Sequence, residues 1–94
     1  MARIVWSLVA RDDLKRIVSY IRADAPAYAR SFALRLKERV THLETFPESG
    51  RSVPEDPTRT YRELIFGNYR VIYRHSESTV TIVTVIHGAR ILRL

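Results

Sequence analysis

Residues 61–74 contain the feature that most constrains the fold of this chain. Two apolar runs, Tyr61 to Phe66 and Tyr69 to Tyr73, flank the dipeptide Gly67-Asn68. Both turn residues tolerate the positive φ that a two-residue hairpin requires, so the pattern predicts a β-hairpin. This turn fixes the register, with position 66 opposite 69, 65 opposite 70, 64 opposite 71 and 63 opposite 72.

The two sides of this hairpin differ in composition. One side is predicted to face the core and carries Leu64, Phe66, Tyr69, Val71 and Tyr73 together with Arg62. The other side carries Tyr61, Glu63, Ile65, Arg70, Ile72 and Arg74. The second side is too charged to be buried, and it is too aromatic and cationic for a surface that has no binding role. We therefore predict that it is a binding face. The alternative is an exposed sheet face on which Arg62, Arg70 and Arg74 are merely solvated.

The first half of the chain predicts a strand and two helices. Residues 2–6 favour a strand that ends at Ser7, a plausible helix N-cap. Apolar residues then recur at helical spacing through about Ala23, and Asp24 with Pro26 marks a break before a second helix that runs to about Phe46. A connection this short favours an antiparallel pair of helices packed on a sheet.

The second half predicts the rest of the sheet. A turn-rich stretch from Phe46 to Pro57 leads into the hairpin, a turn follows at residues 75–78, and Thr79 to His87 alternate as a last strand. The fold class is therefore α+β, with a two-helix hairpin on one face of a small, mainly antiparallel four-stranded sheet. The predicted core consists of Trp6, Leu14, Ile17, Leu36, Val40, Leu64, Val71 and Ile82.

Length and charge limit the function classes. With 94 residues the chain is one domain, 1–94, and without cysteine it is expected to be held by packing. The formal net charge of +6 points to an acidic partner, and arginine dominates because the only lysines are Lys15 and Lys37. The N-terminal residues match neither a signal peptide nor a membrane span, so we expect a soluble, cytoplasmic protein with no membrane partner.

The sequence contains no motif for a metal or a cofactor. The histidines, His42, His75 and His87, lack metal-ligand spacing, and the three glycines form no phosphate-binding loop. We therefore expect no metal site and no cofactor. His87 is a possible proton carrier or a structural residue at a strand end. If residue 74 pairs with 79, then 70 pairs with 83 and His87 lies on the same face as Arg70.

Several segments in order resemble the RelE/ParE superfamily of bacterial type II toxins, and more closely its ParE-like branch. The resemblance covers nearly the whole chain and rests on residues 4–7, Ala10, Leu14, Tyr20-Ile21, Ala29, Phe32, residues 43–51, 61–64, 68–74 and 85–90. It implies a cognate acidic antitoxin whose C-terminal segment wraps the helices and adds to the sheet. RelE-like members cleave mRNA on the ribosome, whereas ParE-like members inhibit DNA gyrase and are not known as enzymes themselves.

The resemblance also implies site residues. If the chain is RelE-like, Arg70, His87 and Arg90 are the catalytic candidates. The predicted target-binding residues are Tyr61, Arg62, Glu63, Arg70, Arg74, Arg90 and Arg93.

Two departures from the RelE-like pattern favour the ParE-like function. The lysines lie on the predicted helices, and the tail Ile91-Leu92-Arg93-Leu94 has no tyrosine, so a lysine-rich catalytic cluster is missing. We therefore predict a gyrase inhibitor. The alternatives are a metal-independent, ribosome-dependent mRNA endonuclease and a non-toxic module that only binds an antitoxin.

Overall fold

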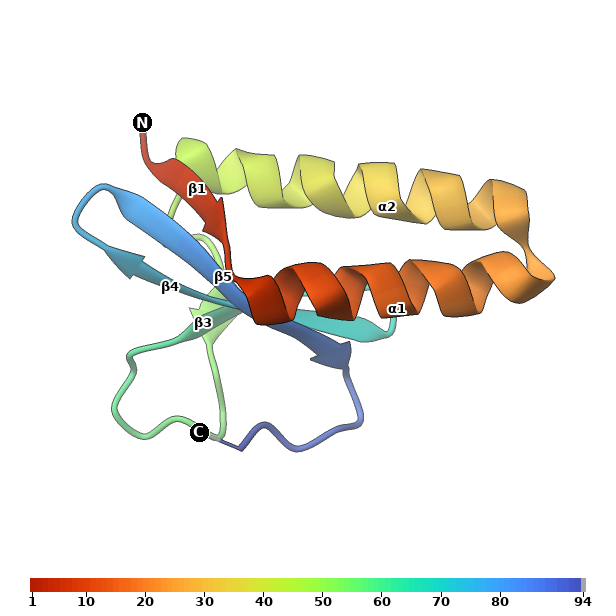
Figure 1. Cartoon of the computed structure of the whole chain (residues 1–94). Coiled ribbons are helices and arrows are strands. Elements are labelled where there is room, and N and C mark those ends of the chain that lie inside the picture. The colour runs from red at the N-terminus through yellow and green to blue at the C-terminus, as the bar shows by residue number, and fades with distance from the viewer. Residues whose placement is uncertain (94) are drawn as a thin grey trace.

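Two antiparallel helices form one layer of the protein in the computed structural model, which describes residues 1–93 (Figure 1). Helix α1 (Leu8–Asp24) begins where predicted, because Ser7 Oγ accepts a hydrogen bond from the Ala10 amide at 3.0 Å. Only Ala25 separates it from α2 (Pro26–Thr41), and Pro26 occupies the first turn of α2, where a missing N–H does no harm. A short 3₁₀ helix, η1 (His42–Glu44), continues the chain toward the predicted end near Phe46.

The second layer is a sheet of five strands: β1 (Arg3–Trp6), β2 (Arg51–Ser52), β3 (Arg62–Phe66), β4 (Tyr69–Ser76) and β5 (Thr79–His87). Their order is β1-β5-β4-β3-β2, with β1 parallel to β5 and every other pair antiparallel. The expected count of four strands is therefore wrong by one. Strand β2 was missed because two residues in a turn-rich stretch show no alternation.

The β3–β4 hairpin confirms its predicted register, with Phe66 opposite Tyr69 and Glu63 opposite Ile72. Gly67 has a φ of +57°, as the turn requires. The β4–β5 register differs from the prediction: Arg70 lies opposite Ile86, not residue 83. Two features cause the shift, a tight turn between Ser76 and Thr79 and an irregularity between Ile72 and Tyr73.

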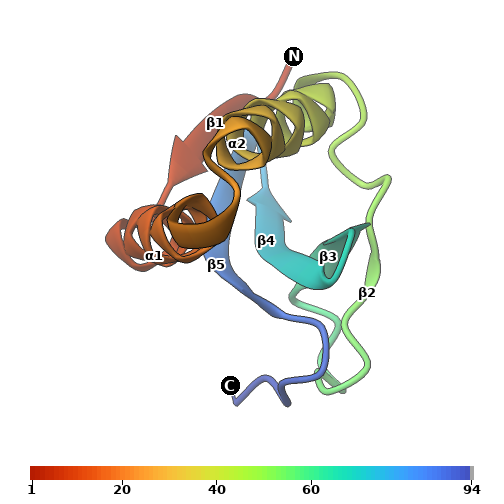
Figure 2. The same cartoon turned by 90° about the vertical axis from the view of Figure 1, so that its right-hand side faces the viewer.

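The core lies between the helices and the sheet (Figure 2). Six of the eight predicted core residues are buried: Leu14, Leu36, Val40, Leu64, Val71 and Ile82. Trp6 and Ile17 are only partly buried and pack against this cluster. Phe32 of α2 makes edge-to-face contacts with Phe66 and Tyr69, with ring centroids 5.4 and 5.5 Å apart. The helical and alternating patterns therefore identified most of the core correctly.

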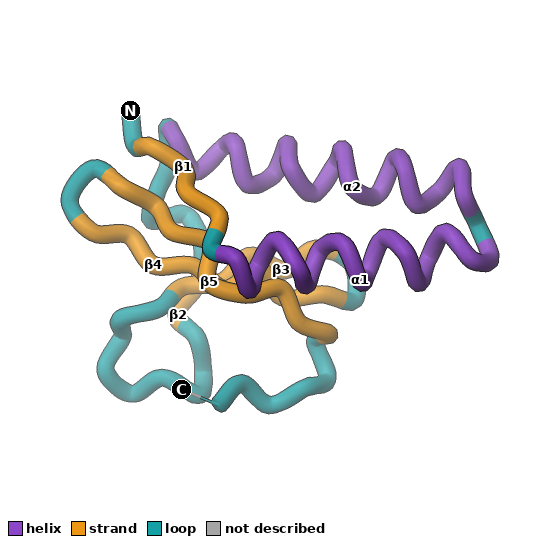
Figure 3. Tube along the Cα trace, viewed as in Figure 1, coloured by secondary structure: helices purple, strands orange, loops and turns teal. Residues whose placement is uncertain are grey.

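The start of α1 covers the part of β5 that β1 is too short to reach. Ser7 Oγ donates to the Val83 carbonyl at 2.8 Å, and Asp13 accepts from the Val85 amide at 3.0 Å and from the Thr84 hydroxyl. These side chains take the place of a neighbouring strand, because buried backbone groups need partners. The arrangement holds the first turns of α1 beside β5 (Figure 3).

Candidate functional site

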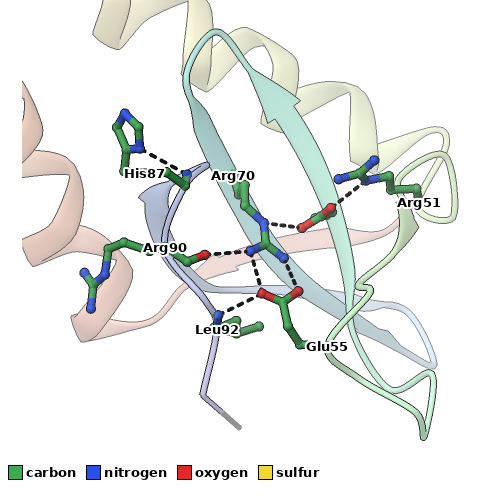
Figure 4. A network of polar contacts seen from close by, with 8 residues as sticks. Arg51, Glu55, Arg70, His87, Arg90 and Leu92 are labelled. Atoms are coloured by element: carbon green, nitrogen blue, oxygen red, sulfur yellow. Dashed lines mark hydrogen bonds and ion pairs between the residues drawn. The ribbon is translucent and has the colours of Figure 1, made fainter.

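Arg70 lies at the centre of a network of charged groups on the sheet face turned away from the helices (Figure 4). Its Nε donates to Glu63 Oε1 at 2.7 Å, and its Nη1 and Nη2 donate to the two carboxylate oxygens of Glu55 at 2.8 and 2.7 Å. Nη1 also donates to the main-chain oxygen of Arg90 at 3.1 Å. A guanidinium has only five N–H donors, and the Arg70 side chain is only 7% exposed, so this guanidinium has little capacity left for another ligand.

Glu63 shares the buried part of this network. Its side chain is fully buried, and its second oxygen, Oε2, accepts from Arg51 Nε at 2.5 Å. Arg51 is brought there by β2, where it pairs directly with Glu63 of β3. Both carboxylate oxygens therefore have a cationic donor, which is the condition under which a buried charge is tolerated.

Glu55 connects the network to the end of the chain. Besides the two bonds from Arg70, its Oε2 accepts from the Leu92 amide at 2.8 Å. The hydrogen bonds from Arg70 first, and then the one from Leu92, lower the pKa of the Glu55 carboxyl from 4.5 to about 2. The same carboxylate raises the pKa of Arg70. These contacts join the loop between β2 and β3, strand β4 and the C-terminal segment, which we define as residues 88–93.

The sequence interpretation of this face was wrong about exposure. Glu63, Arg70 and Ile72 are 1%, 5% and 0% exposed, whereas the composition of this side predicts that it is too charged to be buried. The positive charges of Arg51 and Arg70 are compensated by the carboxylates of Glu63 and Glu55, which lie on other strands or on the loop between β2 and β3. Composition alone does not reveal this pairing. Ile65, on the same side, does remain exposed. A role of Glu63 and Arg70 in target binding stays a prediction.

The other predicted target-binding residues are scattered around this network. Arg62 donates through Nη1 to the main-chain oxygens of Glu48 at 3.1 Å and Gly50 at 2.9 Å, and so supports the loop before β2. Tyr61 is half-buried, whereas Arg74, Arg90 and Arg93 are exposed. Of this group, only Arg90 reaches Arg70, and it does so through its main chain.

His87 does not join Arg70 as the predicted register implied. It pairs with Tyr69 across β4 and β5, so it lies on the opposite side of the sheet from Arg70. Its ring contacts the Tyr69 ring at a centroid distance of 5.6 Å, and Nδ1 accepts from the Ala89 amide at 3.1 Å. Figure 4 shows the imidazole directed away from the charged network. The expectation that the two side chains share a face is therefore wrong.

Sequence reasoning missed three members of the network. Arg51, Glu55 and the Leu92 amide come from segments without a regular pattern, 12 to 37 residues from the groups they bind. The one available signal was the presence of Glu55 in Pro54-Glu55-Asp56-Pro57, an acidic loop in a basic chain. That composition suggests a partner for arginine without indicating which one.

Two of the surface grooves lie on different sides of the sheet. The helix groove lies between α1 and α2 and has apolar walls with basic residues around them: Trp6, Leu14, Val18 and Ala33, with Arg11, Lys15, Arg22 and Lys37. The tail groove lies between the start of α1, the open sheet face and the C-terminal segment. Its lining includes Val9, Tyr61, Val83, Ile86, Ile91 and Arg93.

Neither metal-ligand clusters nor spanning helices occur in the described chain. Among residues 1–93, no three His, Asp or Glu side chains are grouped so that they could bind a metal ion. Neither helix within that range combines the length and apolarity needed to cross a membrane.

Comparison with known proteins places the chain in a family. Residues 4–92 match the model of the ParE toxin of the type II toxin-antitoxin system parDE. This chain belongs to the ParE toxin family. The curated protein "Toxin RelE2" of Caulobacter vibrioides is 38% identical over 92 residues, which cover 97% of this chain and 100% of that protein. The chain is thus a type II toxin of the RelE/ParE superfamily.

Solved structures agree with the ParE-family fold. The structure described as the chromosomal ParDE system from P. aeruginosa superposes with a TM-score of 0.78 at 19% identity, covering 93% of this chain and 96% of that one. The RelBE2 toxin-antitoxin complex from Mycobacterium tuberculosis gives 0.63 at 21% identity, covering 92% and 96%. At these identities the likeness concerns the fold, and it confirms the helical hairpin packed on a mostly antiparallel sheet.

Proposed function

We propose that this ParE-family toxin acts by binding a protein target, DNA gyrase, and not by cleaving RNA. The observation that carries this proposal is the engagement of the Arg70 guanidinium by Glu55, Glu63 and the Arg90 carbonyl. An arginine that stabilises a phosphorane must direct free N–H groups at the developing charge. Two carboxylates already neutralise this guanidinium, so it is better suited to holding the structure together than to catalysis.

The position of His87 supports the same conclusion. A general acid or base has to reach the atom whose charge the arginine stabilises, within about 3 Å or through one water. His87 lies on the other side of the sheet and pairs with Tyr69. The two residues on which an endonuclease mechanism would depend therefore project from opposite faces of the sheet, although both line a hollow at the Gly67-Asn68 end of the hairpin.

A second candidate function is ribosome-dependent mRNA cleavage. The similarity to a protein named RelE2 favours it, as do the exposed His87 and Arg90 at the end of β5. Such a mechanism would use these two residues without Arg70. Both candidate targets are cytoplasmic, so we propose the cytoplasm as the site of action.

The proposed partner is an acidic antitoxin bound in the helix groove. This groove has an apolar floor and four basic residues around it, which suits an amphipathic segment with carboxylates on its edges. The solved neighbours are toxin-antitoxin systems, which supports the assignment. Co-expression with the product of an adjacent gene should yield a stable complex. Harmless growth at high expression without such a partner would favour a non-toxic module.

One experiment separates the two targets. The purified protein is added to a gyrase supercoiling assay and, separately, to programmed ribosomes carrying a labelled message. We expect inhibited supercoiling and an intact message. The variant His87→Ala distinguishes the mechanisms, because loss of a proton carrier lowers a rate by about 10²–10⁴-fold.

We expect His87→Ala to inhibit gyrase as the parent does. Arg70→Ala, or truncation after Ala89, should weaken inhibition because the C-terminal segment loses its anchor or is removed. Circular dichroism of each variant controls for unfolding. Cleavage of the message by the parent, lost in His87→Ala, would reject gyrase as the target of this toxin.

A further inference from the structure

The tail groove has exposed apolar side chains on both walls. Val9, in the first turn of α1, is 59% exposed, and Ile91 of the C-terminal segment is 76% exposed. Between them the floor is formed by Val83 and Ile86 of β5 with Tyr61 beside them. Large apolar side chains left in water on two facing walls indicate a surface that is covered in a complex.

Arginines surround this apolar surface. Arg16, Arg90 and Arg93 line the groove, and the Arg16 side chain is 72% exposed. The carboxylate in the lining, Asp13, is already occupied by Arg16 at 2.6 Å, by the Val85 amide and by the Thr84 hydroxyl. The groove therefore presents positive charge outward, which complements an acidic partner.

The buried network explains how the wall of this groove is held. Arg70 binds the Arg90 carbonyl, and Glu55 binds the Leu92 amide. At the start of the segment, the Gly88 amide donates to the Asn68 carbonyl at 2.6 Å. A segment without helix or strand is thus held at three alternate residues, Gly88, Arg90 and Leu92. A preorganised wall reduces the ordering entropy that binding would otherwise cost.

We propose that the tail groove binds an acidic, extended or helical segment of the toxin's protein target, with apolar side chains of that segment inserted between Val9 and Ile91. This inference rests on the proposed function and adds the surface that performs it. A protein segment fits better than a nucleic acid, because Tyr61 is the one aromatic ring in the lining, and the side chains between the arginines are mostly aliphatic and offer no stacking platform for bases. The groove is also separate from the helix groove, so target and antitoxin binding are expected to be separable by mutation.

The test measures gyrase inhibition and antitoxin affinity on the same variants of the purified protein. Val9→Glu and Ile91→Glu place a carboxylate on each wall, and the first should not disturb α1 because acidic residues are favourable at a helix N-terminus. We expect each to raise the half-inhibitory concentration by at least about tenfold. Antitoxin affinity, measured by calorimetry, should be unchanged.

A third variant, Arg93→Glu, reverses a charge in the tail groove. Two control variants make the same kinds of charge change outside the tail groove. Leu34→Glu adds the same charge at a residue of α2 that is 58% exposed, and Arg35→Glu reverses a charge on α2 for comparison with Arg93→Glu. Both controls should inhibit gyrase as the parent does, whereas Arg93→Glu should be weaker. Unfolding curves for all variants exclude misfolding as the cause.

Each outcome is decisive. If the parent inhibits gyrase and both Val9→Glu and Ile91→Glu inhibit equally well, the groove assignment is wrong while the proposed function stands. If only Arg93→Glu weakens inhibition, the groove acts through charge alone and not through apolar contacts. Binding of a labelled oligonucleotide to the groove would then identify a nucleic-acid surface and overturn the proposal. If the parent does not inhibit gyrase, the proposed function is wrong and this assignment falls with it.

Discussion

On the face that meets the helices, the sheet buries Val71, Tyr73 and Ile82 against apolar residues such as Leu36, whereas on the opposite face it buries Glu63 and Arg70. The first face needs only apolar area of suitable shape, since the hydrophobic effect has no direction. The second needs particular donors opposite particular acceptors, because an unpaired buried charge is costly. The first face therefore depends on the volume and shape of its apolar side chains, and the second depends on the correct position of three chain segments.

The comparison explains why the charged face carries the C-terminal segment. Buried ion pairs often contribute little net stability compared with apolar residues of similar volume. Here the pairs fix the loop that contains Glu55 and the segment that contains Leu92, neither of which is a helix or a strand. We infer that this face is built to position groups, while the helix-covered face supplies the stability.

The largest expected effect comes from breaking the charged face. Arg70→Met leaves Glu63 buried without one of its two cations, so we expect the free energy of unfolding to fall by about 3–5 kcal/mol in urea titrations. The control is Arg74→Met, an exposed position four residues along the same strand, which should change the free energy of unfolding by less than about 0.5 kcal/mol. Equal effects of the two variants would mean that the network does not matter to stability.

Shortening a buried apolar side chain tests the contribution of the helix-covered face to stability. Leu36 is fully buried between the layers, so Leu36→Ala should lower the free energy of unfolding by about 2–5 kcal/mol through lost burial and a cavity. Leu34→Ala, on the exposed side of the same helix, serves as the control. An unchanged denaturation midpoint for Leu36→Ala would contradict the assignment of the core.

The smallest effect, and the one that distinguishes the two faces by their chemistry, is the response to acid. The pKa of Glu55 is about 2 in the folded protein and 4.5 as its ordinary value, so its contribution to stability is complete above pH 4.5. That contribution is lost as the pH falls from about 4.5 toward about 2. The parent should therefore be more stable than Glu55→Gln at neutral pH, with the difference shrinking over this range.

Denaturation midpoints of both proteins at several pH values measure this difference. The stability lost in Leu36→Ala should show no such pH dependence, because no ionisable group is removed. A difference between the parent and Glu55→Gln that stays constant from neutral pH to pH 3 would show that the ion pair with Arg70 is not formed in solution.

The predictions from the sequence were more accurate for the helix-covered face of the sheet than for the charged face. Six of the eight predicted core residues are buried, because apolar periodicity reports which side of each element meets the core. The predictions that Arg70 is exposed and that it shares a face with His87 are wrong. An irregularity between Ile72 and Tyr73 and a tight turn after Ser76 changed the β4–β5 register, and a one-residue change moves a side chain to the other face.

The sequence by itself determined the local elements: the N-cap at Ser7, the helix start at Pro26 and the hairpin turn at Gly67-Asn68. Each depends on backbone preferences and hydrogen bonds among residues close together in the chain. Only the tertiary structure decided that Arg70 is buried, that His87 lies on the other face of the sheet and that the C-terminal segment is held by Arg70 and Glu55. The physical reason is that an ion pair between residues 15 positions apart, such as Arg70 and Glu55, leaves no periodic signal in either segment.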